Sequence, residues 1–224
     1  MIYSLKTNDQ INPYGIIDDI SYSFIATKGN RFEFVLSDDI EFHNLLIKKE
    51  VLLDNANHFK ADCKYEKGHH YFWKMIREEE ESEVVTFFVA DDLDASFITP
   101  KEDITHPVFF KEFDSNNIKE ARLVVTGLGL YQCYLNGNKI DHGYLNPGFN
   151  DYDDYLRYQE IDITSLIKEQ NKLEVIVGDG IYKGRMGFDN HPGEIWGSKY
   201  LLCAKVILIK NDGTREEILT DTSW

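Results

Sequence analysis

Apolar and polar residues alternate with a period of two along most of this chain, in short runs bounded by Gly, Asn and Asp. This spacing is typical of β-strands, and few windows repeat with the 3.6-residue period of a helix. The runs are rich in aromatic and β-branched side chains, which pack well on a pleated sheet. The pattern therefore predicts an all-β protein. In the first part of the chain, strands are expected at 21–26, 31–36, 70–77 and 84–89.

Two regions interrupt this pattern. Residues 39–53 fit neither period cleanly and are compatible with a short helix or with a pair of strands. Farther along, an acidic segment at 90–94 is followed by two prolines with polar residues between them, a composition that marks a connection. We therefore expect a first domain over 1–92, a linker over 93–106 and a second domain over 107–224.

The second domain is predicted to be a β-sandwich or jelly roll. The sequences Asn-Gly-Asn at 136–138 and Asn-Asp-Gly at 211–213 tolerate positive φ, so each is expected to join neighbouring antiparallel strands. One helical turn is expected near 164–167, with Thr164 or Ser165 as its N-cap. The strands are expected at 108–113, 121–128, 130–135, 156–163, 172–177, 200–210 and 216–219.

Composition restricts the possible partners. The chain has 224 residues, of which 39 are acidic and 24 basic, so its formal net charge is -15. This charge repels nucleic-acid phosphates and anionic membranes, and it suits a neutral or cationic ligand. A hydrophobic fraction of 42% is that of a folded globular protein.

The cysteines and the amino-terminal sequence predict a cytoplasmic protein. Cys63, Cys133 and Cys203 are odd in number, far apart and without metal-ligand spacing, so they are interpreted as reduced core thiols. The first residues lack the basic and apolar regions of a signal peptide, and no run approaches 18 apolar residues. A secreted protein whose signal peptide had been removed would show the same features, so that alternative stays open.

A series of motifs in the second half resembles a known family. Its motifs lie at 121–131, 134–137, 146–149, 158–164, 177–185, 212–215 and 220–224. This series is similar to the N-terminal β-sandwich domain of bacterial α-L-rhamnosidases, glycoside hydrolase family 78. The segments 12–16 and 71–74 of the first half resemble the fibronectin-type-III-like domain that precedes this domain in the family.

This resemblance implies a fold and an activity for the parent protein. It implies a fibronectin-III/immunoglobulin-like sandwich followed by a jelly-roll-like β-sandwich similar to a carbohydrate-binding module. The parent enzyme would hydrolyse terminal α-L-rhamnose by inversion, using two carboxylates on a downstream (α/α)6 catalytic barrel. Because the family's acid and base lie beyond the equivalent of Trp224, no catalytic residue is assigned here, and the chain alone is expected to be inactive. The expected partners are a rhamnose-containing carbohydrate and that barrel.

The first candidate ligand-binding residues are Asn150, Asp151 and Tyr152, which follow the Pro-Gly-Phe sequence at 147–149. Carboxylates and rings suit sugars, since hydroxyls need acceptors and the apolar face of a pyranose stacks on an aromatic ring. A resemblance to carbohydrate-binding module family 67 implies that calcium and acidic or amide side chains hold rhamnose, which assigns a possible calcium ion to Asn150 and Asp151. A solvated acidic loop is the alternative, and no cofactor is required.

A second set of candidates lies in and after the glycine-rich segment 178–185. Its three glycines indicate tight backbone geometry more than a phosphate cradle. Asp179, Tyr182 and Arg185 are candidates for a sugar groove or for docking against the barrel. Trp196, in the loop 191–197, is either a stacking platform or a side chain folded back on the sandwich.

Three functional hypotheses follow. In the first, the two domains are accessory domains that position or bind a rhamnoside for the catalytic barrel. In the second, they form a calcium-assisted rhamnose-binding module, for which calcium should increase sugar affinity. In the third, they are purely structural and present an apolar docking patch without binding sugar.

Overall fold

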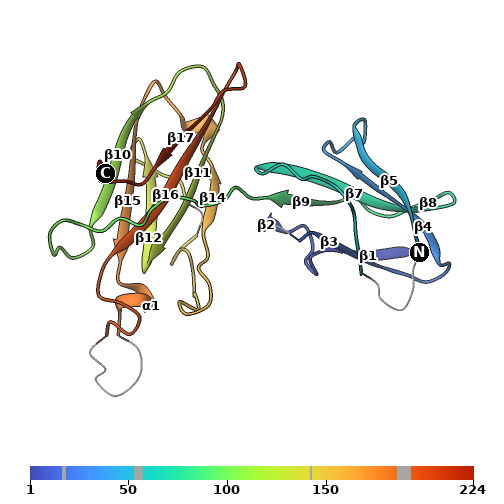
Figure 1. The fold of residues 1–224 in the computed structure, drawn as a ribbon, viewed down its shortest axis with the longest axis horizontal. Helices are drawn as coiled ribbons and strands as arrows, with labels where there is room; N and C mark the ends of the chain where they lie inside the picture. Colours follow the sequence, from blue (N-terminus) through green and yellow to red (C-terminus); the bar gives the residue numbers. More distant parts are fainter. Residues whose placement is uncertain (17–18, 53–57, 142, 186–192) are drawn as a thin grey trace. The chain divides into compact units, whose positions relative to one another are not determined.

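The computed structural model describes residues 1–16, 19–52, 58–141, 143–185 and 193–224. The chain divides into two compact units, Met1–Asp92 and Leu93–Trp224. The segment 93–106, expected to be a linker, is grouped with the second unit. Each unit is built almost entirely of β-strands, which confirms the predicted all-β class (Figure 1). No helix in the described ranges is both long and apolar enough to cross a membrane.

The first unit contains two sheets that enclose an aromatic core. Tyr22, Phe34, Trp73 and Phe87 are fully buried, and the Trp73 Nε1–H donates to the Thr7 hydroxyl over 2.9 Å. The pairs are antiparallel except for β2 and β9, which run parallel. One sheet has the order β1 (Ile2–Thr7), β3 (Ser21–Ala26) and β6 (His58–Lys60). The other has the order β2 (Tyr14–Ile16), β9 (Val85–Val89), β7 (His69–Arg77), β4 (Arg31–Ser37) and β5 (Leu45–Leu52), and β8 (Glu80–Glu81) pairs with β7.

The four strands predicted in this part are confirmed as β3, β4, β7 and β9. Within the ambiguous segment 39–53, residues 45–52 form one strand, β5, which pairs with β4, residues 39–44 form a turn before it, and residue 53 lies outside the described residues. Strand β1 was not predicted. Its register with β3 shifts between Tyr3 and Lys6, and Ser4 has φ 54°, so a bulge interrupts the alternation that would have marked it.

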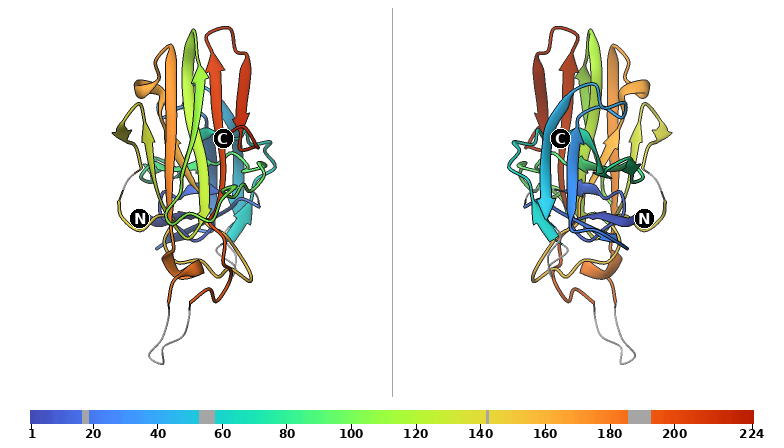
Figure 2. Two further views of the ribbon diagram at one scale, coloured as in Figure 1. Left: turned by 90° about the vertical axis from the view of Figure 1, so that its left-hand side faces the viewer. Right: turned by 90° about the vertical axis from the view of Figure 1, so that its right-hand side faces the viewer.

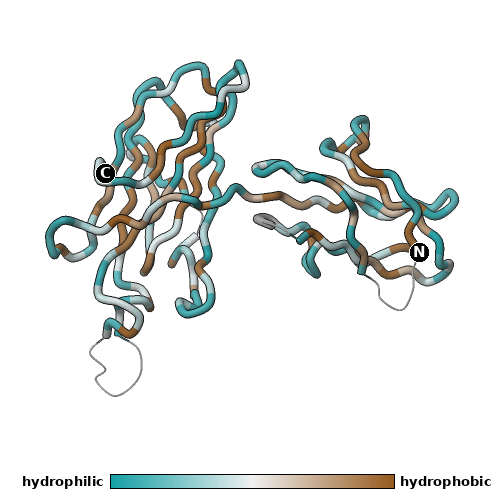
Figure 3. Tube along the Cα trace, viewed as in Figure 1, coloured by the Kyte–Doolittle hydropathy of each residue, from teal (hydrophilic) through white to brown (hydrophobic). Residues whose placement is uncertain are grey.

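The second unit is a sandwich of two four-stranded antiparallel sheets. Side chains that alternate along each strand point between the sheets, and Leu123, Leu135, Leu173 and Val206 are fully buried there. Figure 3 shows these hydrophobic stretches along the central strands, with polar residues in many of the loops. One sheet has the order β10 (Val108–Asp114), β15 (Gln170–Gly178), β12 (Leu130–Leu135) and β13 (Asn138–Lys139). The other has the order β14 (Gln159–Asp162), β11 (Ile118–Leu128), β16 (Leu201–Lys210) and β17 (Arg215–Leu219).

Both predicted hairpin turns are confirmed. Asn136 and Gly137 have φ values of 52° and 80° and connect β12 to β13, whereas Gly213, with φ 85°, lies in the turn between β16 and β17. The predicted N-cap is wrong. A 3-10 turn, η1, spans Thr164–Leu166 without a side-chain cap, because the Thr164 hydroxyl accepts the backbone N–H of Ala121 instead.

The segment 94–98 is bonded to β16 and to the residue after β17. Ile98 and Leu202 exchange two backbone hydrogen bonds, of 2.8 and 3.0 Å. The Lys205 ammonium, only 3% exposed, lies 2.8 Å from Asp94 Oδ1. The Thr220 hydroxyl donates to the Ser96 carbonyl oxygen over 2.6 Å. These bonds make the segment part of the second unit.

Replacing Leu173 by Ala should destabilise the second unit by about 2–5 kcal/mol, because the substitution leaves a cavity between the two sheets. Urea unfolding monitored by circular dichroism measures this change. The matched control is Leu145→Ala, since Leu145 is 68% exposed and should change the free energy of unfolding by less than about 0.5 kcal/mol. Equal effects of the two variants would contradict the sandwich core.

The Asp94–Lys205 pair should make stability depend on pH. The hydrogen bond from Lys205 lowers the pKa of Asp94. The stabilisation is therefore complete above the unfolded carboxyl pKa of about 3.9 and is lost as the pH falls through the lower folded value. Asp94→Asn should lower the free energy of unfolding at pH 7 by roughly 1 kcal/mol or less, because Asp94 is largely exposed.

Urea unfolding of both proteins between pH 7 and pH 2 measures the difference, which should disappear at the acid end. Asp114→Asn is the control, since Asp114 is exposed. A difference between wild type and Asp94→Asn that does not change with pH would show that the pair contributes no charge-dependent stability.

Candidate functional site

A short helix, α1 (Gly180–Lys183), lies at one end of the second unit, opposite the turn between β16 and β17 (Figures 1 and 2). The backbone is closely packed here. Gly180 has φ 53°, and a Cβ atom on it would lie 2.9 Å from the backbone of Gly129 and Leu130. A Cβ on Gly184 would lie 2.1 Å from the Gly180 carbonyl oxygen. The tight geometry predicted for this glycine-rich segment is therefore confirmed, and it determines where the α1 side chains emerge.

Three aromatic candidates from separate parts of the chain meet beside α1, and we call Tyr152, Tyr182 and Trp196 the aromatic cluster. The ring centroid of Tyr152 lies 5.1 Å from that of Tyr182 and 5.3 Å from that of Trp196. The backbone N–H of Trp196 donates to the Tyr182 carbonyl oxygen over 3.4 Å. Each of the three side chains is only partly buried, so part of each ring contacts solvent. Trp196 thus packs on its neighbours and keeps an accessible surface. Residues 191 and 192 of its predicted loop lie outside the described residues.

Asn150 is fully buried beneath this cluster. Its Oδ1 accepts the backbone N–H of Arg157 over 2.9 Å, which closes the loop between them. Its Nδ2 makes no hydrogen bond of normal geometry with the described residues. Burial raises the pKa of the Tyr152 hydroxyl, and the nearby Asn150 side chain partly opposes that rise. Asn150 therefore closes the loop through its bond to Arg157.

Asp151 begins a turn at the surface of the same loop. Its carbonyl oxygen accepts the backbone N–H groups of Asp154 and Tyr155 over 3.0 and 2.8 Å. Calcium takes roughly six to eight oxygen ligands. The described residues contain no group of three or more His, Cys, Asp or Glu side chains that could hold a metal ion, and the Asn150 oxygen is already bonded to Arg157. As placed, Asn150 and Asp151 do not form a calcium ligand set, so calcium binding there stays a prediction.

A buried chain of polar groups anchors the start of this loop inside the sandwich. The Asn146 amide donates to Asp141 Oδ2 over 2.6 Å, and Asp141 Oδ1 accepts the backbone N–H of Cys133 over 2.9 Å. The Gln159 amide donates to Asn146 Oδ1 over 3.1 Å, and Gln159 Oε1 accepts the Tyr131 hydroxyl over 2.9 Å. Every member is thus hydrogen-bonded, which makes the anchor rigid. The roles of Asp141 and Gln159 were not predicted, because most of their partners are distant in sequence.

The two remaining candidates of the glycine-rich segment differ in their surroundings. Asp179 Oδ1 accepts the hydroxyl of Tyr200 over 2.5 Å. Burial, and then the hydrogen bond with Asp179, raise the pKa of Tyr200. Arg185 is exposed and makes no hydrogen bond or ion pair with the part of the chain that the structure describes. Asp179 therefore has a positioning role, and the structure does not bring Arg185 into the aromatic cluster.

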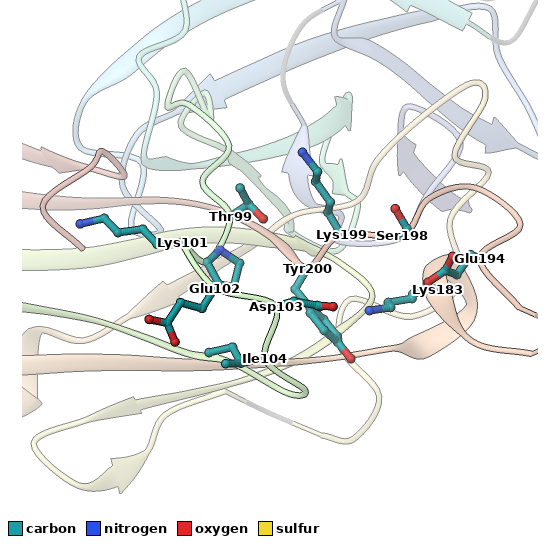
Figure 4. Close-up of a pocket in the computed structure, with 11 residues that line it drawn as sticks. Thr99, Lys101, Glu102, Asp103, Ile104, Lys183, Glu194, Ser198, Lys199 and Tyr200 are labelled. Carbon is teal, nitrogen blue, oxygen red and sulfur yellow. The ribbon is translucent and has the colours of Figure 1, made fainter.

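A polar pocket of about 440 Å³, which was not predicted from the sequence, lies next to α1 (Figure 4). One wall is formed by the segment 99–104, and the other comes from α1 and residues 194–200. The Lys183 ammonium lies 4.2 Å from the centroid of the Tyr200 ring. The lining residues are Thr99, Pro100, Lys101, Glu102, Asp103, Ile104, Lys183, Glu194, Ser198, Lys199 and Tyr200.

Partly exposed rings beside hydroxyl, carboxylate and ammonium groups can bind a polyhydroxylated ligand. The rings offer stacking surfaces for the apolar face of a sugar, and the polar groups offer donors and acceptors for its hydroxyls. Comparison with known proteins finds a match for the part of the second unit that carries the aromatic cluster. Residues 116–224 match the family model described as the α-L-rhamnosidase N-terminal domain.

The second unit contains these residues, so we call it the rhamnosidase domain after this similarity. The rhamnosidase domain is 36% identical over 109 residues to an α-L-rhamnosidase of Streptomyces avermitilis, a match that covers 48% of this chain and 10% of the relative. It is 30% identical over 114 residues to an α-L-rhamnosidase of Formosa agariphila, covering 49% of this chain and 12% of the relative. The chain thus spans about a tenth of these curated relatives.

The solved structure of the α-L-rhamnosidase from Aspergillus terreus resembles the whole chain. It superposes with a TM-score of 0.77 at 25% identity, covering 100% of this chain and 29% of that one. This likeness includes residues 1–92, which the family model does not cover. The fibronectin-type-III-like character of those residues stays a prediction.

Replacing Gly197 by Ala should disturb the aromatic cluster, because a Cβ there would lie 2.1 Å from the Tyr182 hydroxyl oxygen and 2.4 Å from Cζ. The displaced ring should lower the free energy of unfolding by roughly 1–3 kcal/mol and change the near-ultraviolet circular dichroism. Ser198→Ala is the control, since Ser198 is the next residue and is exposed. A Gly197→Ala spectrum identical to that of wild type would show that Tyr182 is not packed on Gly197.

Proposed function

We propose that the rhamnosidase domain is an accessory domain that contacts rhamnose-containing carbohydrate for α-L-rhamnoside hydrolysis by a longer protein. The observation that carries this proposal is the aromatic cluster, because three partly exposed rings are held in fixed positions at one end of the sandwich. The matched relatives are α-L-rhamnosidases, which makes L-rhamnose the sugar to test first. The chemistry of hydrolysis itself belongs to the downstream catalytic barrel expected for the family.

The aromatic cluster suits this role because its rings are already ordered without a ligand. The Tyr152 ring packs against those of Tyr182 and Trp196, and Tyr182 and Trp196 are joined by a backbone hydrogen bond. A ring that is already ordered loses little conformational entropy on binding, so more of the stacking energy contributes to affinity. The methyl-bearing, apolar face of a deoxy sugar such as rhamnose is the kind of surface that stacks on such rings.

A purely structural role is the second candidate, and an apolar pocket favours it. This pocket, of about 530 Å³, is lined by Phe97, Ile104, Val108, Phe110 and Trp224 among others, and the first four of these are 42–51% exposed. Exposed apolar surface of this kind suits contact with another protein surface. The two roles use different residues, so one experiment distinguishes them.

The test is a titration of the chain with L-rhamnose and with methyl α-L-rhamnoside, followed by calorimetry and by Trp fluorescence, with and without calcium. Wild type should bind saturably. Tyr152→Ala and Trp196→Ala should each weaken binding by about threefold to tenfold, as expected for the loss of one stacked ring. Tyr144→Ala is the matched control, because Tyr144 is 87% exposed and lies outside the aromatic cluster.

The calcium arm uses Asn150→Ala and Asp151→Ala. Binding that requires calcium and is lost in both variants would establish the calcium-assisted module and assign those two side chains to the ion. Binding that does not depend on calcium would leave the aromatic cluster as the contact surface. If wild type binds neither sugar under either condition, the accessory binding role fails and the structural role remains.

A further inference from the structure

The polar pocket and the aromatic cluster share the same two chain segments. Helix α1 contributes Tyr182 to the cluster and the next residue, Lys183, to the pocket. The returning segment contributes Trp196 to the cluster and then Tyr200 to the pocket. The backbone N–H of Glu194 donates to the Lys183 carbonyl oxygen over 2.8 Å, so the two segments are bonded together. The cluster and the pocket are therefore built from neighbouring residues of the same two segments.

The charges of the pocket are balanced, although the chain as a whole is strongly acidic. Three lysines and three carboxylates line it, in a chain of net charge -15. Within the described ranges, none of these six side chains forms an ion pair. Their donors and acceptors are thus available to a ligand. A balanced set of this kind suits a neutral ligand with many hydroxyls better than an anion or a cation. The six are Lys101, Lys183 and Lys199 with Glu102, Asp103 and Glu194.

Two of these six charged side chains, Asp103 and Lys183, lie next to Tyr200. Figure 4 shows Lys183 and Asp103 next to Tyr200, whereas Lys101 and Lys199 carry their ammonium groups away from it. The Tyr200 ring is 5% exposed, and its hydroxyl is bonded to Asp179, so its position is fixed. The Lys183 ammonium lies over that ring, and no carboxylate of the described residues forms an ion pair with it.

We propose that the polar pocket is a second sugar subsite, which binds the unit next to the one held at the aromatic cluster. Asp103 accepts hydroxyl hydrogens of that unit, Lys183 donates to its oxygens, and Ile104 contacts its apolar face. The rhamnosidase domain then recognises a neutral oligosaccharide of at least two units, not a single terminal sugar. The volume of about 440 Å³ lies within the range of small-molecule sites. This inference rests on the proposed function, since the first unit occupies the aromatic cluster.

The test compares the affinity of the full chain for methyl α-L-rhamnoside with its affinity for neutral disaccharides. The disaccharides carry a nonreducing α-L-rhamnose in 1,2-, 1,3- and 1,4-linkage to a second rhamnose, and calorimetry measures each Kd. At least one disaccharide should bind about tenfold or more tightly than the monosaccharide, since a hydrogen bond to a charged group contributes about that much. Lys183→Met and Asp103→Asn should each reduce this disaccharide's affinity to nearly the monosaccharide level.

Lys119→Met and Asp114→Asn are the matched controls, because both residues are exposed and lie outside the polar pocket. Both should retain the tighter disaccharide binding, and thermal melting should show all four variants folded. Equal affinity for the monosaccharide and all three disaccharides would overturn the second subsite while leaving the proposed function intact. Tighter disaccharide binding that persists in Lys183→Met and Asp103→Asn would also overturn it. Absence of binding to every sugar would overturn the proposed function, and this inference with it.

Discussion

The close backbone contact between the β11–β12 connection and the end of β15 is the constraint on which the candidate site depends. A Cβ atom on Gly129 would lie 2.1 Å from the Gly178 carbonyl oxygen, so only glycine allows the two backbones to approach this far. The approach brings α1 against the end of the sandwich. Tyr182 of α1 then belongs to the aromatic cluster, and the next residue, Lys183, lines the polar pocket. The aromatic cluster and the polar pocket therefore both depend on this close approach of the two backbones.

Most of the fold could be predicted from the sequence because the sandwich core uses regular alternation. Strand β12 was predicted with its observed bounds, since Tyr131, Cys133 and Leu135 alternate with more polar residues. The prediction was wrong or incomplete where a local interaction overrides the pattern. The bulge in β1 breaks its period, and Thr164 bonds to the neighbouring strand and not to its own helical turn. Both effects depend on a partner that is remote in sequence.

The candidate site was only partly predictable for the same reason. Tyr152, Tyr182 and Trp196 were predicted as candidates from their residue types and their positions, and the structure brings them together. Nothing in the local sequence distinguishes Lys183 or Tyr200 from ordinary surface and core residues. Their significance arises from the pocket that α1 and residues 194–200 form with the segment 99–104, which only the three-dimensional structure shows. Residue type thus predicts the stacking surface, whereas the pocket depends on tertiary contacts.

The buried hydrogen-bonded chain from Asp141 through Asn146 to Gln159 determines which part of the loop between Asn146 and Gln159 can change in sequence. Its directional hydrogen bonds hold the two ends of the loop to the interior, and Asn150 closes it by bonding to Arg157. The outward residues between these anchors, Asp153 to Leu156, are exposed and contribute little to that framework. Related proteins can therefore exchange this stretch, in length or in chemistry, without rebuilding the sandwich. The exposed stretch 153–156 is thus free to vary while the buried anchor maintains the fold.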